Sequence, residues 1–275
     1  MYDAAPEWPP SGIDPEVPST ARVYDALLGG KENFKADREA AEVFTRALPR
    51  IADAARLNRD ALARGVRYMV GRAGIDQIID IGCGLPAAPN THEVAQELDP
   101  RARVVYVDND PMVLSHGRAL LADDRTTTVV TADLRDPAAI LTNPDLRAHL
   151  DFDRPVALML LNTLMQIADA EDPDAIIATL MAPLASGSHL FITAWPDTGD
   201  PSQRALSRAC LETLGNGWAR PVEAIRGHFQ GMPMVAPGLD FIPRWHPGEA
   251  DGNVPAAEDL EPFERTHMAG IAVKP

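Results

Sequence analysis

The chain has 275 residues, 45% of them apolar and 24% charged, a composition that excludes a disordered or fibrous protein. Its formal net charge of −15 disfavours phosphate backbones and anionic lipid, so we expect neither nucleic acid nor a membrane as a partner. No apolar run approaches the length of a membrane helix, and the first residues lack the apolar segment of a secretory signal. Two widely separated cysteines, Cys83 and Cys210, suit a reducing compartment, and we predict a cytoplasmic protein.

The N-terminal part of the chain predicts helices. Residues 1–18 are proline-rich and are expected to form an extended arm. Residues 19–75 follow with a helix that begins at Ser19 or Thr20 and ends at the Gly29–Gly30 pair. The three predicted helices are residues 20–28, 37–48 and 51–72. We expect residues 19–75 to form a helical cover over a site in the rest of the chain, because a site at a sheet edge is otherwise open to water.

Residues 76–275 change to short β-rich runs separated by helical stretches, the pattern of βαβ units in a parallel sheet. The predicted strands are residues 77–81, 103–107, 127–131, 156–161 and 188–194. The helical stretches are residues 91–98, 111–121, 137–141, 145–150, 173–181 and 201–214. Two later runs, 239–245 and 267–274, are expected to pair antiparallel at the sheet edge. We therefore predict one α/β domain over residues 76–275.

The strongest local pattern follows the first predicted strand, where Asp80 precedes a turn that contains Gly82 and Gly84. Ligands of open α/β sheets bind at the carboxyl ends of strands, and glycine lets a ligand approach the backbone closely. The pattern therefore indicates a ligand site. The alternative is a tight strand-to-helix connection without a ligand, because short glycine patterns are common.

The next two predicted strands also end in carboxylates. Asp108 lies 24 positions after Gly84, an offset typical of an acidic residue that accepts both hydroxyls of an adenosine ribose. Asp133 ends the third strand, where its carboxylate is able to accept the exocyclic amine of adenine. The alternative for Asp108 is a cap for the helix that starts near Pro111, and Asp133 can likewise serve as a loop or cap residue. Three successive strand-end acids favour one shared ligand site.

Two nucleotide-like ligands compete for this pattern. Gly82, Gly84 and Ala87 match the fingerprint of a nicotinamide or flavin dinucleotide. Against that ligand, Pro86 removes a backbone donor from the turn, and Asp80 would face an anionic pyrophosphate. A cationic ligand with an amino-acid head group, S-adenosylmethionine, fits Asp80 better.

These strand-end motifs resemble the successive cofactor motifs of Rossmann-like class I methyltransferases. Residues 21–34, 89–95 and 106–111 are similar to signatures of the actinobacterial S-adenosylmethionine-dependent methyltransferase family that was first catalogued as a domain of unknown function. The resemblance runs from about residue 18 to residue 275. It implies a seven-stranded, mostly parallel sheet with an antiparallel C-terminal strand, S-adenosylmethionine as the cofactor, and no particular methyl acceptor. The expected cofactor-binding residues of the sheet domain are Asp80, Gly82, Gly84, Asp108, Asn109, Asp133 and Leu134.

The segment Tyr24–Phe34 adds candidates from the helical cover. It joins an apolar helical face to a glycine pair and then to polar side chains at Lys31 and Asn33. We expect Tyr24 and Asn33 to contact the cofactor. In the alternative interpretation, the glycine pair only ends the helix and the polar residues are solvated.

Two residues are candidates for the acceptor side of the site. Asn162 follows the fourth predicted strand, where substrate would meet the methyl group, and Trp195 follows the fifth, where it would form an aromatic wall. The alternatives are a helix cap for Asn162 and packing under a loop for Trp195. The sequence does not determine whether a catalytic base exists, and none need exist, because methyl transfer from a sulfonium is an in-line displacement that chiefly requires alignment. The histidines and cysteines show no metal-ligand spacing.

The leading functional hypothesis is a methyltransferase that acts on a small molecule. One alternative is a protein that binds S-adenosylmethionine or S-adenosylhomocysteine without transferring a methyl group, because Met165 stands where relatives often carry histidine. A nicotinamide-dependent oxidoreductase ranks third. The sequence specifies neither the acceptor, nor the pathway, nor the oligomeric state.

Overall fold

The computed structural model describes residues 12–120, 125–248 and 254–275. Within these ranges, seven strands form one sheet in the order β3-β2-β1-β4-β5-β7-β6. The strands are β1 (Gln77–Ile81), β2 (Arg103–Asp108), β3 (Thr127–Thr131), β4 (Ala157–Leu161), β5 (His189–Ala194), β6 (Asp240–Phe241) and β7 (Met268–Val273). Strands β1 to β5 are parallel, and β7 runs antiparallel to both β5 and β6. The mostly parallel sheet with antiparallel C-terminal strands is thus confirmed.

Alternating residues of the central strands face two separate apolar layers. Ile78 of β1 packs in a cluster with Val66 of α3 (Ile51–Arg67), whereas its neighbour Ile79 packs in a cluster with Ile176 of α8 (Pro173–Met181). Burial on both faces explains why these strands read as continuous apolar runs. The helices are α1 (Thr20–Leu28), α2 (Lys35–Ala47), α3 (Ile51–Arg67), α4 (Thr91–Leu98), α5 (Pro111–Leu120), α6 (Pro137–Thr142), α7 (Pro144–His149), α8 (Pro173–Met181), α9 (Pro201–Leu214) and α10 (Val222–Gly227).

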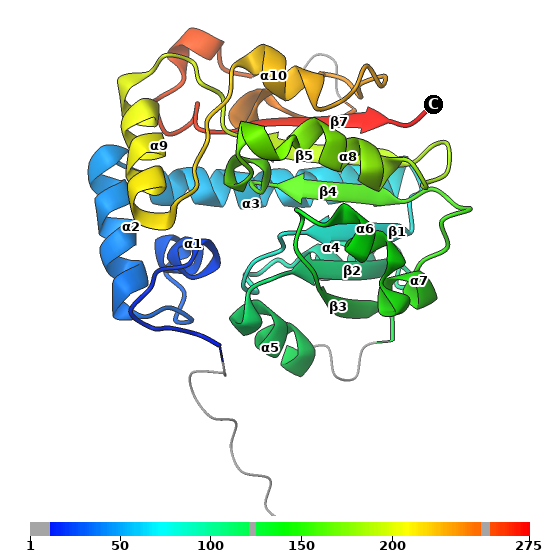
Figure 1. Cartoon of the computed structure of the whole chain (residues 1–275). Helices are drawn as coiled ribbons and strands as arrows, with labels where there is room; N and C mark the ends of the chain where they lie inside the picture. The colour runs from blue at the N-terminus through cyan, green and yellow to red at the C-terminus, as the bar shows by residue number, and fades with distance from the viewer. Residues whose placement is uncertain (1–11, 121–124, 249–253) are drawn as a thin grey trace, which may run out of the picture.

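Three helices gather beyond the carboxyl ends of the parallel strands: α1 and α2 from the start of the chain, and α9 from its second half (Figure 1). Their facing side chains, including Val23, Phe44 and Leu206, form one buried cluster with Trp195 at the end of β5. As the sequence predicts, the hydroxyl of Ser19 caps α1 by accepting from the N–H of Arg22.

Several predicted elements differ from the structure in their bounds, and helix α10 was not predicted. The helix predicted over residues 51–72 is α-helical only to Arg67 and ends in a π-helical turn over Tyr68–Arg72. The helix predicted to start at residue 37 starts at Lys35. The strand predicted at 239–245 is reduced to β6, because Pro243 has no N–H for a sheet and lies in a 3-10 turn.

Part of the predicted arm, residues 1–11, lies outside the described residues. Residues 12–18 form neither helix nor strand, and the guanidinium of Arg22 donates to the carbonyls of Asp14 and Val17. In the described parts of the chain, no helix is both long enough and apolar enough to span a membrane.

Candidate functional site

A cavity of about 330 Å³, here called the first cavity, lies at the carboxyl ends of β1, β2 and β4. It is also lined by the start of α1 and the middle of α3. Eight of the nine predicted cofactor-binding residues line it, namely Tyr24, Asp80, Gly82, Gly84, Asp108, Asn109, Asp133 and Leu134, and so does the acceptor candidate Asn162. Asn33 and Trp195 are not among its lining residues.

The turn after β1 depends on its two glycines. Gly82 and Gly84 have φ angles of 71° and 66°, in the left-handed region that favours glycine. A Cβ atom on Gly82 would lie 1.9 Å from the side chain of Thr163, so this position has no space for any side chain. Beyond Gly84, by contrast, nothing lies within 4 Å of a Cβ position, and the backbone there faces open space.

Asp108 binds this turn directly. Its Oδ2 accepts from the N–H of Gly84 at 2.9 Å, and its Oδ1 accepts from the N–H of Asp110, also at 2.9 Å. Burial raises the pKa of Asp108, and the backbone donors oppose that rise. Asp108 does not cap α5, since Asp110 accepts from the N–H of Met112 at 2.8 Å. A carboxylate has about four acceptor positions, so Asp108 keeps capacity for a ligand.

Asp80 is the most buried carboxylate that lines the first cavity, with 4% of the residue exposed. Its Oδ2 accepts from the hydroxyl of Thr91 at 2.6 Å. Burial raises its pKa to about 6, against the opposing effects of the Thr91 hydrogen bond and the positive charge of Arg59. The charge of Asp80 therefore changes close to neutral pH.

Arg59 of α3 is a lining residue that the sequence analysis missed. Its guanidinium donates to the carbonyls of Ala87 and Pro89, which fixes the loop after the glycine turn against α3. Its Nε is buried and has no hydrogen-bond partner in the described structure. No local pattern marks this residue, because it lies in a helix that carries several other arginines.

Asp133 and Asn109 form a polar edge of the cavity. The amide of Asn109 donates to Asp133 at 2.8 Å, and the N–H of Arg135 donates to the same carboxylate at 2.9 Å. Burial raises the pKa of Asp133, but these hydrogen bonds and the charge of Arg135 outweigh it, and the pKa is lowered overall. Asp133 is thus ionised and lies at a partly exposed edge.

Tyr24 and Asn33 have different surroundings. The hydroxyl of Tyr24 donates to the carbonyl of Ala55 at 2.9 Å, and burial raises its pKa. The amide of Asn33 instead donates to Asp25 at 2.8 Å, within the turn between α1 and α2. Gly30 is required there, because a Cβ at that position would lie 1.9 Å from Asp25 Oδ1. Asn33 therefore shapes this turn, and the structure does not bring it to the cavity.

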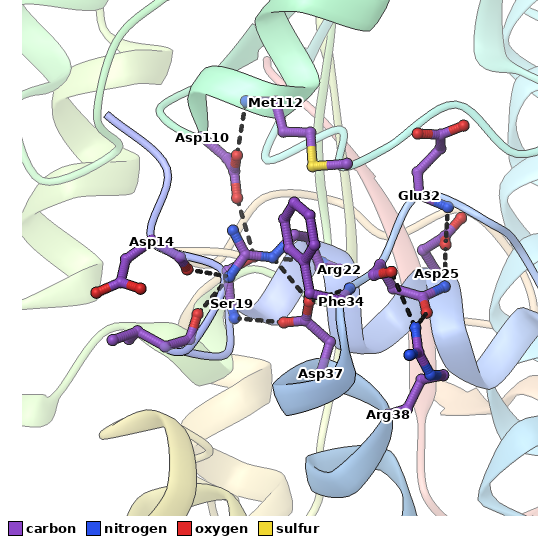
Figure 2. Close-up of polar contacts among 12 residues, drawn as sticks. Asp14, Ser19, Arg22, Asp25, Glu32, Phe34, Asp37, Arg38, Asp110 and Met112 are labelled. Atoms are coloured by element: carbon purple, nitrogen blue, oxygen red, sulfur yellow. Dashed lines mark hydrogen bonds and ion pairs between the residues drawn. The ribbon is translucent and has the colours of Figure 1, made fainter. Parts of the chain in front are cut away.

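A buried polar network joins α1 to α2 and to the loop after β2 (Figure 2). Arg22 and Asp37 form an ion pair at 2.9 Å, with 4% and 0% of their side chains exposed. The backbone N–H of Ser19 donates to Asp37, and the hydroxyl of Ser19 donates to Asp110 at 2.9 Å. Asp110 belongs to the loop after β2 that lines the first cavity. The network thus ties the helices to the loop beside Asp108.

A second cavity of about 40 Å³ lies between α1, α2, α3 and α9. It shares four lining residues with the first cavity: Thr20, Tyr24, Asn162 and Leu214. Its other lining residues are Val23, Leu27, Phe44, Ile51, Ala55, Met165, Trp195, Leu206, Cys210 and His267. Trp195 therefore contributes to this compartment.

Three polar side chains meet at the second cavity. The indole N–H of Trp195 donates to Nε2 of His267 at 2.9 Å, and Oδ1 of Asn162 lies 3.1 Å from the same nitrogen. Burial lowers the pKa of His267 to about 3. Asn162 has a φ of 56°, and its backbone N–H donates to the Thr193 hydroxyl. The N-cap residue of the following 3-10 helix is Thr163, not Asn162. His267 was missed as a site residue, because it lies more than a hundred positions after Asn162.

Residues 6–275 match the sequence profile of the family described as S-adenosyl methyltransferase. The chain belongs to this family. It is an S-adenosylmethionine-dependent methyltransferase, as the sequence motifs predict. The described residues contain no group of three or more histidine, cysteine, aspartate or glutamate side chains placed to hold a metal ion.

Solved structures agree with this assignment. A candidate methyltransferase from Thermobifida fusca shares 49% sequence identity with this chain, with a TM-score of 0.91 over 97% of this chain and 98% of that one. A protein of the DUF574 family from Streptomyces avermitilis shares 36% identity, with a TM-score of 0.87 over 95% and 99% of the two chains. The structure of human N-acetylserotonin methyltransferase in complex with S-adenosylmethionine shares 12% sequence identity with this chain. Its TM-score is 0.50, over 94% of this chain and 63% of that one, and this likeness shows the fold alone.

Among curated proteins, this chain is similar to the ribosomal RNA small subunit methyltransferase H of Halorhodospira halophila. The similarity is 33% identity over 92 residues, which is 32% of this chain and 28% of that protein. The match thus spans little more than a quarter of the relative.

Proposed function

We propose that this methyltransferase acts in the cytoplasm on a small-molecule acceptor, which enters through the boundary between the first and second cavities. The observation that carries the proposal is that a large cavity lined by several carboxylates and a small, mainly apolar cavity share the lining residues Tyr24 and Asn162. The net charge of −15 opposes an RNA acceptor. Both cysteines, Cys83 and Cys210, are free thiols, which suits a reducing compartment.

The residues of the first cavity fit S-adenosylmethionine. The cofactor carries a cationic sulfonium, an ammonium, a carboxylate and an adenosine, and its volume suits a pocket of this class. We assign Asp80 to the ammonium group, Asp108 to the ribose hydroxyls, and Asp133 with Asn109 to the adenine edge. Leu134, 7% exposed, supplies an apolar contact for the base.

Arg59 complements these acids. Its buried and unpartnered Nε needs an acceptor, and the carboxylate of the cofactor's amino-acid head is an acceptor of the right charge. With Asp80 beside it, the site then offers one group of each sign to a zwitterionic head group. The backbone at Gly82 and Gly84 allows that head group to approach closely.

When bound, S-adenosylmethionine supplies a methyl group on a sulfonium, and this chain's own residues align the acceptor with it. Tyr24 and the start of α1 exclude water from the meeting point, and Asn162 contacts the acceptor. We assign residues 19–75 as the helical cover and residues 76–275 as the cofactor-binding domain, held together by the Ser19–Asp110 hydrogen bond.

The packing of Met165 removes the argument for a protein that only binds the cofactor. This side chain is 4% exposed and lies in the apolar cluster with Trp195 and Phe44, while its carbonyl accepts from the N–H groups of Gly217 and Trp218. A buried apolar side chain at this place forms an acceptor wall, so the absence of a histidine does not imply the absence of an acceptor.

Titration calorimetry with S-adenosylmethionine, S-adenosylhomocysteine and NAD tests the cofactor assignment on a sample whose fold is verified by circular dichroism. We expect binding of the first two and none of NAD. A metabolite library is then screened for formation of S-adenosylhomocysteine. Turnover of ribosomal RNA, with no turnover of any small molecule, would contradict the proposed acceptor class.

A further inference from the structure

The described lining of the second cavity carries no charged side chain. Among its described lining residues there is no aspartate, glutamate, lysine or arginine, although the chain carries 40 acidic and 25 basic residues. Its walls are the apolar side chains of α1, α2, α3 and α9. A charged ligand would lose its hydration there without gaining a counter-charge, so the compartment favours an uncharged one.

Trp195 fixes the state of His267 at the polar end of this cavity. The indole N–H of Trp195 is a donor only, so the Nε2 of His267 that it contacts must be unprotonated. The imidazole is then neutral, with its proton on Nδ1. Burial lowers the pKa of His267 to about 3, which agrees with this arrangement. His267 is therefore not available as a base.

The neutral His267 in turn orients the carboxamide of Asn162. Because Nε2 carries a lone pair and no proton, the Oδ1 of Asn162 at 3.1 Å would be repelled, whereas an Nδ2–H group in its place shares that lone pair with the Trp195 N–H. The two amide atoms of Asn162 are therefore assigned in exchanged places. The carbonyl oxygen of Asn162 then faces away from His267. Apart from His267, no described residue makes a hydrogen bond to this side chain. The carbonyl thus offers an acceptor position where the two cavities meet.

We propose that the second cavity binds the methyl acceptor, and that this acceptor is a small, uncharged amine whose N–H donates to the carbonyl of Asn162. This inference rests on the proposed function. The compartment of about 40 Å³ holds only a few water-sized groups, so the apolar part of the acceptor is short. A neutral nitrogen suits a site without a base, because it attacks through its lone pair before it loses a proton.

The chemistry balances without a further reactant. The nitrogen lone pair forms the new N–C bond, and the C–S bond breaks with its electron pair left on sulfur. The products are S-adenosylhomocysteine and an N-methylammonium ion, which releases its N–H proton to water. A hydroxyl or thiol would first have to lose its proton, and no lining residue of the second cavity accepts it.

Three fluorinated probes of similar shape test the proposal by ¹⁹F NMR on protein saturated with S-adenosylhomocysteine. At pH 8, 2,2,2-trifluoroethylamine is an uncharged amine, 2,2,2-trifluoroethanol a neutral hydroxyl compound, and trifluoroacetate an anion. We expect line broadening for the two neutral probes but not for trifluoroacetate, and a new methylated product signal from the amine alone when S-adenosylmethionine replaces S-adenosylhomocysteine. Methylation of the alcohol, or broadening by trifluoroacetate, would overturn the assignment.

Variants locate the probe. Cys210 lines the second cavity but not the first, so the larger side chain of Cys210→Leu should fill the second cavity only. This variant should weaken amine binding about tenfold, while S-adenosylhomocysteine still binds. The matched control is Leu211→Ala, because Leu211 lies on the same helix but is 36% exposed. This variant should change neither the binding of the amine nor that of S-adenosylhomocysteine. With Asn162→Asp, ethylamine, which is a cation at pH 8 and carries no fluorine, should displace trifluoroethylamine and sharpen its ¹⁹F signal.

The two proposals fail in different ways. If the unmodified protein does not bind S-adenosylhomocysteine, the cofactor assignment fails. If it binds S-adenosylhomocysteine and the amine signal is the same with Cys210→Leu as without it, only the assignment of the acceptor compartment fails.

Discussion

The carboxylate of Asp108 at the end of β2 accepts a hydrogen bond from the backbone N–H of Gly84 in the turn after β1, at 2.9 Å. Two adjacent strand ends are thereby joined through one side chain. The same carboxylate lines the first cavity. It thus shapes the glycine turn and, in the proposed function, holds the ribose of the cofactor.

Replacing Asp108 by alanine should weaken cofactor binding. We expect a loss of about 1.5–3 kcal/mol in the binding free energy of S-adenosylhomocysteine, the scale of hydrogen bonds to a charged group. Calorimetry measures it, and circular dichroism checks the fold. Asp133→Ala is the comparison variant and should reduce the binding free energy by a smaller amount, because apolar burial also contributes to the binding of adenine. A larger loss for Asp133→Ala would reverse the assigned order of importance.

Cofactor affinity should fall as the pH is lowered through the pKa of Asp80. Burial raises that pKa to about 6, so the carboxylate is charged at pH 7.5 and mostly protonated at pH 5. A protonated Asp80 no longer attracts the ammonium group, and the Kd of S-adenosylhomocysteine should rise about tenfold between these two pH values. The Asp80→Asn variant should bind S-adenosylhomocysteine weakly, with a Kd that does not change over this pH range. A flat profile for the unmodified protein would refute the role of Asp80.

Breaking the Arg22–Asp37 ion pair should destabilise the fold. Both side chains are buried, so Asp37→Asn leaves an uncompensated charge and should lower the free energy of unfolding by about 3 kcal/mol. Urea denaturation measures this change. The exposed pair Lys35–Glu39 on the same helix is the control, and Glu39→Gln should change stability by about 0.5 kcal/mol or less. Similar effects of the two variants would contradict the buried geometry.

The glycine pair after α1 should respond unequally to alanine. Gly29 has a φ of 81° with no atom within 4 Å of a Cβ position, so Gly29→Ala should cost about 1 kcal/mol in backbone strain. Gly30→Ala places a Cβ against Asp25 and disturbs its hydrogen bonds to Glu32 and Asn33, so about 2–3 kcal/mol is expected. Thermal or urea unfolding of both variants compares them. A larger loss of stability for Gly29→Ala than for Gly30→Ala would show that backbone strain, rather than a clash with Asp25, limits substitution in this turn.

The strand ends were predictable because local sequence determines them. Asp80, Asp108 and Asp133 each follow a run of strand-forming residues, and parallel strands bring their carboxyl ends to one edge, so the three acids line one cavity. Arg59 and His267 were not predictable in this way. Each reaches the site from a segment whose position relative to β1 or β4 depends on tertiary packing.

The expectations for α1 show a second limit. The apolar face and the glycine stop of α1 are local features, and both were predicted from the sequence. The direction of the Asn33 side chain depends on Asp25, a buried carboxylate that needs donors at that point. A polar residue near a glycine pair serves such an internal acceptor as readily as a ligand.

The two cavities draw on different stretches of the chain. The acids and glycines of the first cavity lie between residues 80 and 134, whereas the walls of the second come from residues 20–55 and 162–267. Substitutions in α1 or α9 can therefore reshape the acceptor compartment while the cofactor motifs stay unchanged. Relatives with the same strand-end motifs are accordingly free to diverge in substrate, and the residues of α1 and α9 are the ones to compare when substrates are assigned across the family.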